Sequence, residues 1–256
     1  MATLTVFSDS SDGVIFAQDP TWADVVSGSA ATFFEMTANT FDGFGQDFNN
    51  GGNNEYGLEP WYGQFDTAAL GAGATVTAVA LSLYGVVAGD ANTAFSLEAR
   101  LYDWGASLTT ADWLTDSQFA ALTRVATFAD VNTNWLAAYN TFSEDGTNFQ
   151  TGLNKTGQTK LIVSTTNHAS GTAPTNSSRV LLYNADQSGT SQDPKLTVTY
   201  EIAGQPLAKR FGGVPFMGAH GSGLQAPVRQ WIRRAAGLLT PQFATTQIWR
   251  PAHGID

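Results

Sequence analysis

Two acidic side chains beside an aromatic residue are the first candidates for chemistry in this sequence. Glu55 and Glu59 lie four residues apart and close to Trp61. A glycosidase uses two carboxyl groups, placed on either side of a sugar bond, as acid and as base or nucleophile. The chain has 22 acidic residues, so some are expected to fall near one another by chance. Hydrolysis of a glycan is therefore the least favoured function.

Oxygen ligands for a calcium ion gather in the same region. Asp42, Asp47, Asn49, Asn53 and Glu55 have the carboxylate and amide oxygens that Ca²⁺ prefers. Their spacing matches no EF-hand. The same residues suit a long polar loop over 42–57 that is held by Asx turns, which is the favoured interpretation. We predict no cofactor and keep Ca²⁺ at Asp42, Asp47 and Glu55 as the alternative.

Aromatic residues offer a second kind of site, a stacking platform for sugars. Trp61, Trp104 and Tyr56, together with the loop 42–57, are the candidates for glycan binding. The favoured interpretation is different: the tryptophans of the first 202 residues serve as core or sheet-edge anchors. They are Trp22, Trp61, Trp104, Trp113 and Trp135.

The usual signatures of catalysis are missing from the sequence. It has no His-Glu-x-x-His and no Gly-x-Ser-x-Gly motif, and the glycines at 71 and 73 are not followed by the lysine of a phosphate-binding loop. His168, His220 and His253 are scattered, and we expect them on the surface. The chain has no cysteine, which excludes disulfides and thiolate metal sites. We predict that the protein is not an enzyme.

The charge is unevenly distributed along the chain. Residues 203–256 hold six Lys or Arg and one acid, a net +5, whereas the whole chain carries −10, which leaves −15 for residues 1–202. Such an acidic body repels nucleic acid, while a basic tail can bind an acidic partner. The alternating pattern also stops at residue 203. We therefore predict two parts, a folded body over 1–202 and an anchoring tail over 203–256.

The tail combines arginines with widely spaced aromatic and aliphatic residues. Pro227 at a first helical position and Gly237 as a stop predict a short helix over 227–236. Docking on a protein is favoured over binding to nucleic acid or a membrane, because the charges are few and the apolar stripe is short. The predicted partner-binding residues are Arg210, Phe211, Val214, Phe216, Arg229, Trp231, Arg233, Arg234, Trp249 and Arg250.

The elements that position these residues are mostly strands. From Phe95 to Leu101 apolar and polar residues alternate, which is typical of a half-buried strand. Many short strands separated by Gly, Asn, Asp and Ser predict an all-β sandwich or barrel. Further runs of this kind are Thr3–Phe7, Gly13–Ala17, Ala31–Met36, Trp61–Phe65, Val79–Leu83, Arg124–Phe128, Lys160–Ser164, Arg179–Tyr183 and Pro194–Tyr200.

One helical insert is predicted within this β body. Over 110–122 the apolar residues Trp113, Leu114, Phe119 and Leu122 fall on one helical face. The segment Thr115-Asp-Ser-Gln118 has the spacing of a capping box, in which two side chains satisfy the first free backbone groups of a helix.

The order of features in residues 1–202 resembles an extracellular jelly-roll family, often called DNRLRE or TGF-β-propeptide-like. Its members are usually stalk, wall or binding proteins rather than enzymes. Similar jelly-rolls, followed by a short tail such as residues 210–216, occur in virion proteins of tailed bacteriophages. The residues that carry the resemblance are Asp12-Gly-Val-Ile-Phe16, Gly73–Val76, Ala80–Tyr84, Ser178–Tyr183 and the closing Asp193-Pro-Lys-Leu-Thr-Val-Thr-Tyr200.

This resemblance implies a jelly-roll β-sandwich that serves as a structural accessory protein of a virion. A capsid decoration, a head fibre and a tail-associated subunit all fit. Other capsid or tail proteins would be its partners, and a homo-oligomer such as a trimer would follow the symmetry of the attachment site. The N-terminal residues show no basic segment followed by an apolar run, and no stretch reaches the ~20 apolar residues of a membrane span. A host-adhesion module that binds glycans is the alternative.

Overall fold

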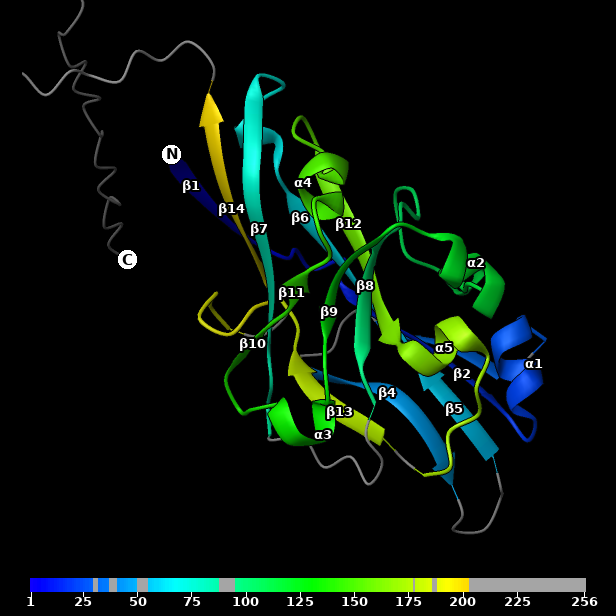
Figure 1. Cartoon of the computed structure of the whole chain (residues 1–256). Helices are drawn as coiled ribbons and strands as arrows, with labels where there is room; N and C mark the ends of the chain where they lie inside the picture. The colour runs from blue at the N-terminus through cyan, green and yellow to red at the C-terminus, as the bar shows by residue number, and fades with distance from the viewer. Residues whose placement is uncertain are drawn as a thin grey trace, which may run out of the picture. The chain divides into compact units, whose positions relative to one another are not determined.

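Two antiparallel sheets form the body of the protein, seen in a computed structural model (Figure 1). The structure describes residues 1–29, 32–36, 41–49, 55–87, 95–176, 178–185 and 188–202, with the backbone alone for 32–36, 41, 42 and 49. Sheet A has the order β1(Ala2–Phe7), β14(Lys195–Ile202), β7(Ala74–Tyr84), β10(Tyr139–Thr141). Sheet B has the order β11(Ser143–Glu144), β9(Arg124–Phe128), β8(Leu97–Leu101), β12(Gln158–Thr165), β6(Trp61–Asp66), β2(Gly13–Asp19), β5(Glu55–Glu59), β4(Phe41–Asn49), β13(Ser178–Tyr183), and β3(Thr32–Met36) also pairs with β2.

The predicted all-β sandwich is confirmed, and each of the ten alternating runs coincides with a strand. The loop expected over 42–57 is wrong for most of its length, because residues 41–49 and 55–59 form β4 and β5. The prediction failed here because the glycines suggest a loop, whereas they lie in a paired strand. Gly43 and Gly45 pair with Leu181 and Arg179 of β13. A side chain at Gly45, whose φ is 141°, would collide with the backbone of Ser178.

Sheet B divides at one proline. Strands β5 and β6 pair with β2 in a single continuous register, Ala17 opposite Leu58 and Val14 opposite Trp61. Pro60 stands between them, and a proline has no N–H for the ladder. On their other edge, β5 pairs with β4 and β6 pairs with β12. The long strand 55–66 therefore carries two separate branches of the sheet.

Two hydrophobic cores lie on opposite faces of sheet B. The first core lies between the two sheets and includes Trp61 and Phe65 from sheet B and Leu81 and Val198 from sheet A. The second core covers the other face of sheet B and includes Tyr62. Because neighbouring residues of one strand point to opposite faces, all five residues of Trp61–Phe65 are buried.

Short helices close the second core. They are α1(Trp22–Ser27), α2(Asp116–Ala121) and α5(Thr166–Ser170), which lie together on one side of sheet B in Figure 1. The predicted capping box is present at α2, where Thr115 and Gln118 bond each other's backbone N–H. The single insert expected over 110–122 is split into η2(Thr110–Asp112) and α2. Other short helices are α3(Val131–Asn134), α4(Asn148–Gly152) and η1(Ala68–Leu70).

His168 lies at the centre of the second core, and our expectation of a surface position is wrong. It is fully buried, and its ring stacks on Phe119 with the centroids 4.6 Å apart. Nε2 is 3.0 Å from the carbonyl oxygen of Leu114, and Nδ1 is 3.0 Å from Oγ of Ser164. A carbonyl can only accept, so Nε2 donates. Because burial lowers the pKa of His168 to about 4, the ring is neutral at pH 7 and Nδ1 accepts from the hydroxyl. This is the neutral imidazole.

The chain divides into two units, residues 1–205 and 206–256. The predicted tail, including the helix expected over 227–236, lies outside the described residues. Within the described part of the chain, no helix is both long and apolar enough to cross a membrane.

The buried His168 predicts a loss of stability in acid. Burial lowers its pKa from 6.5 to about 4, against smaller opposing effects of Leu114 and Asp116. The unfolded chain therefore binds the proton first, and the free energy of unfolding falls as the pH drops from about 6.5 to 4. The contribution of this group is at most about 3 kcal/mol.

Urea unfolding, followed by tryptophan fluorescence at pH 7 and pH 4.5, measures this loss. A His168→Asn variant should be less stable at pH 7 but should lose less on acidification than the wild type. Carboxylates that titrate in the same range act equally in both proteins, so the difference between them isolates His168. Equal losses in both would contradict the prediction.

Candidate functional site

The aromatic residues proposed for glycan binding do not form one platform. Trp61 is fully buried in the first core, and its Nε1 donates to Oδ1 of Asn184 at 3.1 Å. Trp104 is only 6% exposed and lies in the second core, on the opposite face of sheet B. Tyr56 is half-buried against Phe48. The favoured interpretation of the body tryptophans as core anchors is confirmed, since all of them are buried.

The two carboxylates considered for hydrolysis occupy opposite ends of β5. Four positions along the strand place their α-carbons about 13 Å apart. Glu59 is buried and pairs with Nε of Arg179 at 2.7 Å, while Glu55 accepts a hydrogen bond from Gln18. Both side chains thus have structural partners, and they do not face each other across a cleft.

Only some of the calcium candidates lie among the described residues. Asp47 and Glu55 lie on the paired strands β4 and β5, whereas the side chains of Asp42 and Asn49 and the whole of Asn53 lie outside the described part. Among described residues, no group of three or more His, Asp or Glu could hold a metal ion. Calcium at this place stays a prediction.

A buried ion-pair network is built on two residues of β8. Glu98 is 5% exposed and Arg100 8%, and their side chains meet at 2.5 Å. Arg124 joins Glu98 at 3.0 Å and Asp145 at 2.8 Å. Arg100 also donates to the carbonyl oxygens of Ala120 and Leu122, at 2.9 and 2.7 Å. The network therefore attaches the end of α2 to sheet B, which is a structural role.

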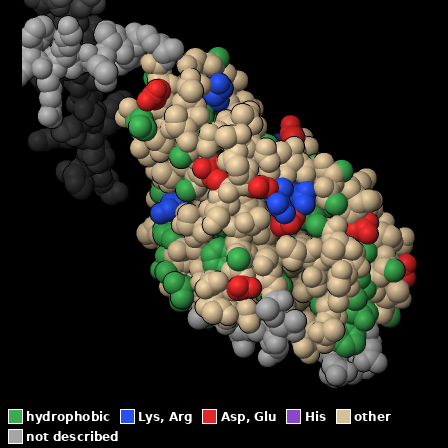
Figure 2. All heavy atoms as spheres, viewed as in Figure 1, with side chains coloured by type: hydrophobic (Ala, Val, Ile, Leu, Met, Phe, Trp, Pro, Cys, Tyr) green, Lys and Arg blue, Asp and Glu red, His purple; other side chains and the backbone are tan. Residues whose placement is uncertain are grey.

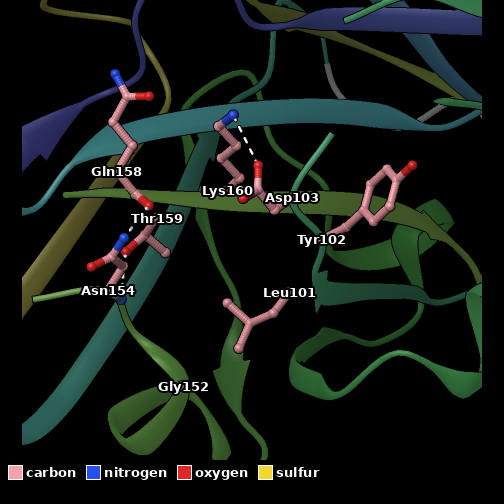
Figure 3. A pocket seen from close by; sticks show the side chains of 8 residues that line it. All are labelled: Leu101, Tyr102, Asp103, Gly152, Asn154, Gln158, Thr159 and Lys160. Atoms are coloured by element: carbon pink, nitrogen blue, oxygen red, sulfur yellow. Dashed lines mark hydrogen bonds and ion pairs between the residues drawn. The ribbon is translucent and has the colours of Figure 1, made fainter. Parts of the chain in front are cut away.

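A polar pocket of about 250 Å³ lies between β8, β12 and α4 (Figure 3). Lys160 and Asp103 lie next to each other in its lining (Figure 3) and form an ion pair at 3.1 Å, and the lysine also donates to the carbonyl oxygen of Gly105. The pKa of Asp103 is lowered by the N–H of Gly105 and by Lys160. The lining consists of Leu101, Tyr102, Asp103, Gly152, Asn154, Gln158, Thr159 and Lys160.

The pocket can hold a small neutral molecule but has no arrangement for acid–base or nucleophilic chemistry. Its one cation is already paired, and Thr159 bonds Thr67 at 2.8 Å. Its volume is below the ~300–1,000 Å³ of ordinary ligand sites. Sequence reasoning missed this pocket, since Gln158 and Lys160 have the spacing of ordinary outward residues at the start of a strand.

The predicted partner-binding residues of the tail, from Arg210 to Arg250, all lie outside the described part of the chain. A role for them therefore stays a prediction. No model of a known protein family matches the chain, and no curated protein matches it either.

The network at Glu98 predicts a large penalty for removing one partner. Arg100→Met leaves the buried Glu98 with only the half-exposed Arg124, and the free energy of unfolding should fall by about 3 kcal/mol. The double variant Glu98→Leu/Arg100→Met should lose much less, because it leaves no buried charge. Urea unfolding of the variants measures both changes.

Arg124→Met is the matched control. This arginine is 42% exposed, and an exposed ion pair contributes at most about 1 kcal/mol. A loss below about 1 kcal/mol for Arg100→Met would show that the network does not hold α2 to the sheet.

Proposed function

We propose that the chain is a structural accessory protein of a virion, in which the sandwich projects from the particle and residues 203–256 anchor it. A capsid decoration, a head-fibre subunit and a tail-associated subunit remain equivalent forms of this proposal. The resemblance of residues 1–202 to jelly-rolls of tailed-bacteriophage virions supports it. Copies would assemble according to the symmetry of their attachment sites.

The way in which the body continues into the tail is the observation that carries the proposal. Strand β14 ends at Ile202, directly before the basic segment. It is an inner strand of sheet A, paired with β1 over six residue pairs and with β7 over eight. A pull on the tail in line with β14 must shear two ladders of hydrogen bonds at once. An edge strand would have only one ladder to resist the same force.

Opposite charges on the two parts also suit an anchor. The body carries −15 and the tail +5. On the side drawn in Figure 2, acidic and basic side chains stand singly or in small groups amid uncharged surface. Arg229, Arg233 and Arg234 would pair with acidic residues of the particle, while the acidic body would repel nucleic acid.

Glycan binding by a host-adhesion module is the second candidate function, and the outer face of sheet A favours it, as developed below. Glycan hydrolysis is disfavoured because Glu55 and Glu59 are each bonded to a structural partner, Gln18 and Arg179.

Co-sedimentation with purified particles of the source virus tests the anchor. The full chain should pellet with particles that lack it, and a chain ending at residue 202 should stay in the supernatant. In the full chain, Arg229→Glu/Arg233→Glu/Arg234→Glu should weaken retention at least tenfold, because three favourable charge contacts become repulsive. Circular dichroism and a thermal melt check that each variant is folded.

A full-length chain with the order of residues 203–256 scrambled is the matched control, since it keeps both charge and composition. Retention of this control would show non-specific charge attraction. That result, like retention of the 1–202 chain or failure of the wild type to pellet, would overturn the proposal.

A further inference from the structure

The outer face of sheet A carries three pairs of threonines. Three neighbouring strands, β1, β14 and β7, lie side by side (Figure 1) and each has a Thr-x-Thr pair. In β1 and β14 the residues between and beside these threonines, such as Leu4 and Val198, pack into the first core. The threonines therefore point away from it. They are Thr3 and Thr5, Thr197 and Thr199, and Thr75 and Thr77.

The strand register aligns the threonines of β1 with those of β14. Thr3 is opposite Thr199, and Thr5 is opposite Thr197. Strands lie about 4.8 Å apart, and alternate residues along a strand about 6.7 Å apart. On β7 the residues opposite Thr197 and Thr199 are Ala80 and Ala78. Thr77 stands at a shift in the register, where it donates to the backbone oxygen of Thr199 at 3.2 Å. The result is two rows in which a pair of threonines lies beside an alanine.

The face between the two ends of β14 has no charge. The four strands of sheet A contain two charged residues, Lys195 at the start of β14 and Glu201 near its end. Soluble proteins usually have charges at about 25–35% of surface positions. On a body of net −15, an uncharged surface of this length favours a neutral ligand over an anion or a cation.

Aromatic rings stand at one end of this face. Tyr84 of β7 is directly opposite Tyr139 of β10, with ring centroids 4.9 Å apart at an angle of 79°. Tyr183 adds a third ring 5.9 Å from Tyr84, and all three side chains are half-buried. Next to the pair, the hydroxyls of Ser82 and Thr141 lie 2.9 Å apart. Nζ of Lys195 lies 3.5 Å from the centroid of the Tyr139 ring and covers one of its faces. Tyr84 and Tyr183 therefore supply the apolar ring surface beside the hydrogen-bonding groups.

From this arrangement we propose that the outer face of sheet A binds a neutral, extended polysaccharide. The C–H faces of a sugar pack on Tyr84 and Tyr183, and the sugar hydroxyls exchange hydrogen bonds with the paired threonines of β1 and β14. The eleven residues of β7 give the face a length of about 35 Å, enough for several sugar units. The site requires nothing of the tail, so anchoring and glycan binding stand or fall separately.

A second copy of the chain is a less suitable occupant. Four strands about 4.8 Å apart, one of them only three residues long, present roughly 500 Å². A stable interface needs about 800 Å² from each partner. A polysaccharide needs no such area, because it gains affinity from repeated contacts along its length.

Affinity electrophoresis of the full chain tests the proposal. Native gels contain soluble xylan, galactomannan, dextran or hydroxyethyl cellulose, and alginate provides an anionic comparison. At least one neutral polysaccharide should slow the wild type, whereas alginate should not. Tyr84→Ala should weaken binding about tenfold through the lost ring contact, and Thr5→Glu should do so by placing a charge in the threonine rows.

Thr110→Glu is the matched control, because it makes the same change at an exposed threonine at the start of η2. It should bind like the wild type. Thermal melts confirm folding, and if Tyr84→Ala does not fold, the comparison of Thr5→Glu with Thr110→Glu decides alone. Lack of retardation by every neutral polysaccharide, or retardation that survives Thr5→Glu, would overturn the proposal. So would a wild-type oligomer, seen by light scattering, that Thr5→Glu dissociates without any effect of polysaccharide.

Discussion

The burial of sheet B on both of its faces is the constraint on which the rest of the structure depends. One face packs against sheet A and the other against α1, α2 and α5. The centre of sheet B, over β2, β5, β6 and β12, therefore has no free face for a ligand. Its strands are buried at successive positions, as in Trp61–Phe65, and the branch point at Pro60 places β4 and β12 on the same edge. Among the described residues, the outer face of sheet A carries exposed side chains.

Covering sheet B with short helices requires that many polar groups be satisfied far from water. Helix ends leave free carbonyl groups, and a buried carbonyl without a partner costs free energy comparable to a lost hydrogen bond. Arg100 bonds two such carbonyls at the end of α2, and the imidazole of His168 bonds a third, that of Leu114. Two buried ionisable groups, His168 and Arg100, therefore serve the packing of the second core. This explains why residues that resemble catalytic ones in the sequence are not grouped in a cleft.

The sequence predicts the sandwich because alternation is visible wherever one face of a strand meets water, as in β1 and β14. It also predicts the capping box at Thr115, since that motif depends on residues three apart. It fails at β4, where Gly43 and Gly45 suggest a loop but are needed for close approach to β13. It fails again at His168, because a lone histidine looks the same whether it is buried or exposed. The pocket at Lys160 joins segments more than fifty residues apart, and no local pattern records such a meeting.

Strand β14 connects the two proposed activities of the molecule. Its inward residues Leu196 and Val198 hold sheet A to the first core, its outward Thr197 and Thr199 pair with the threonines of β1, and its last residue leads into the basic tail. A polysaccharide lying across β1, β14 and β7 would bridge the same two ladders that resist a pull on the tail. Its contacts would then add to the hydrogen bonds that must break before β14 can slide. A particle held to a glycan through this protein would therefore load β14 in the direction in which the sheet is strongest.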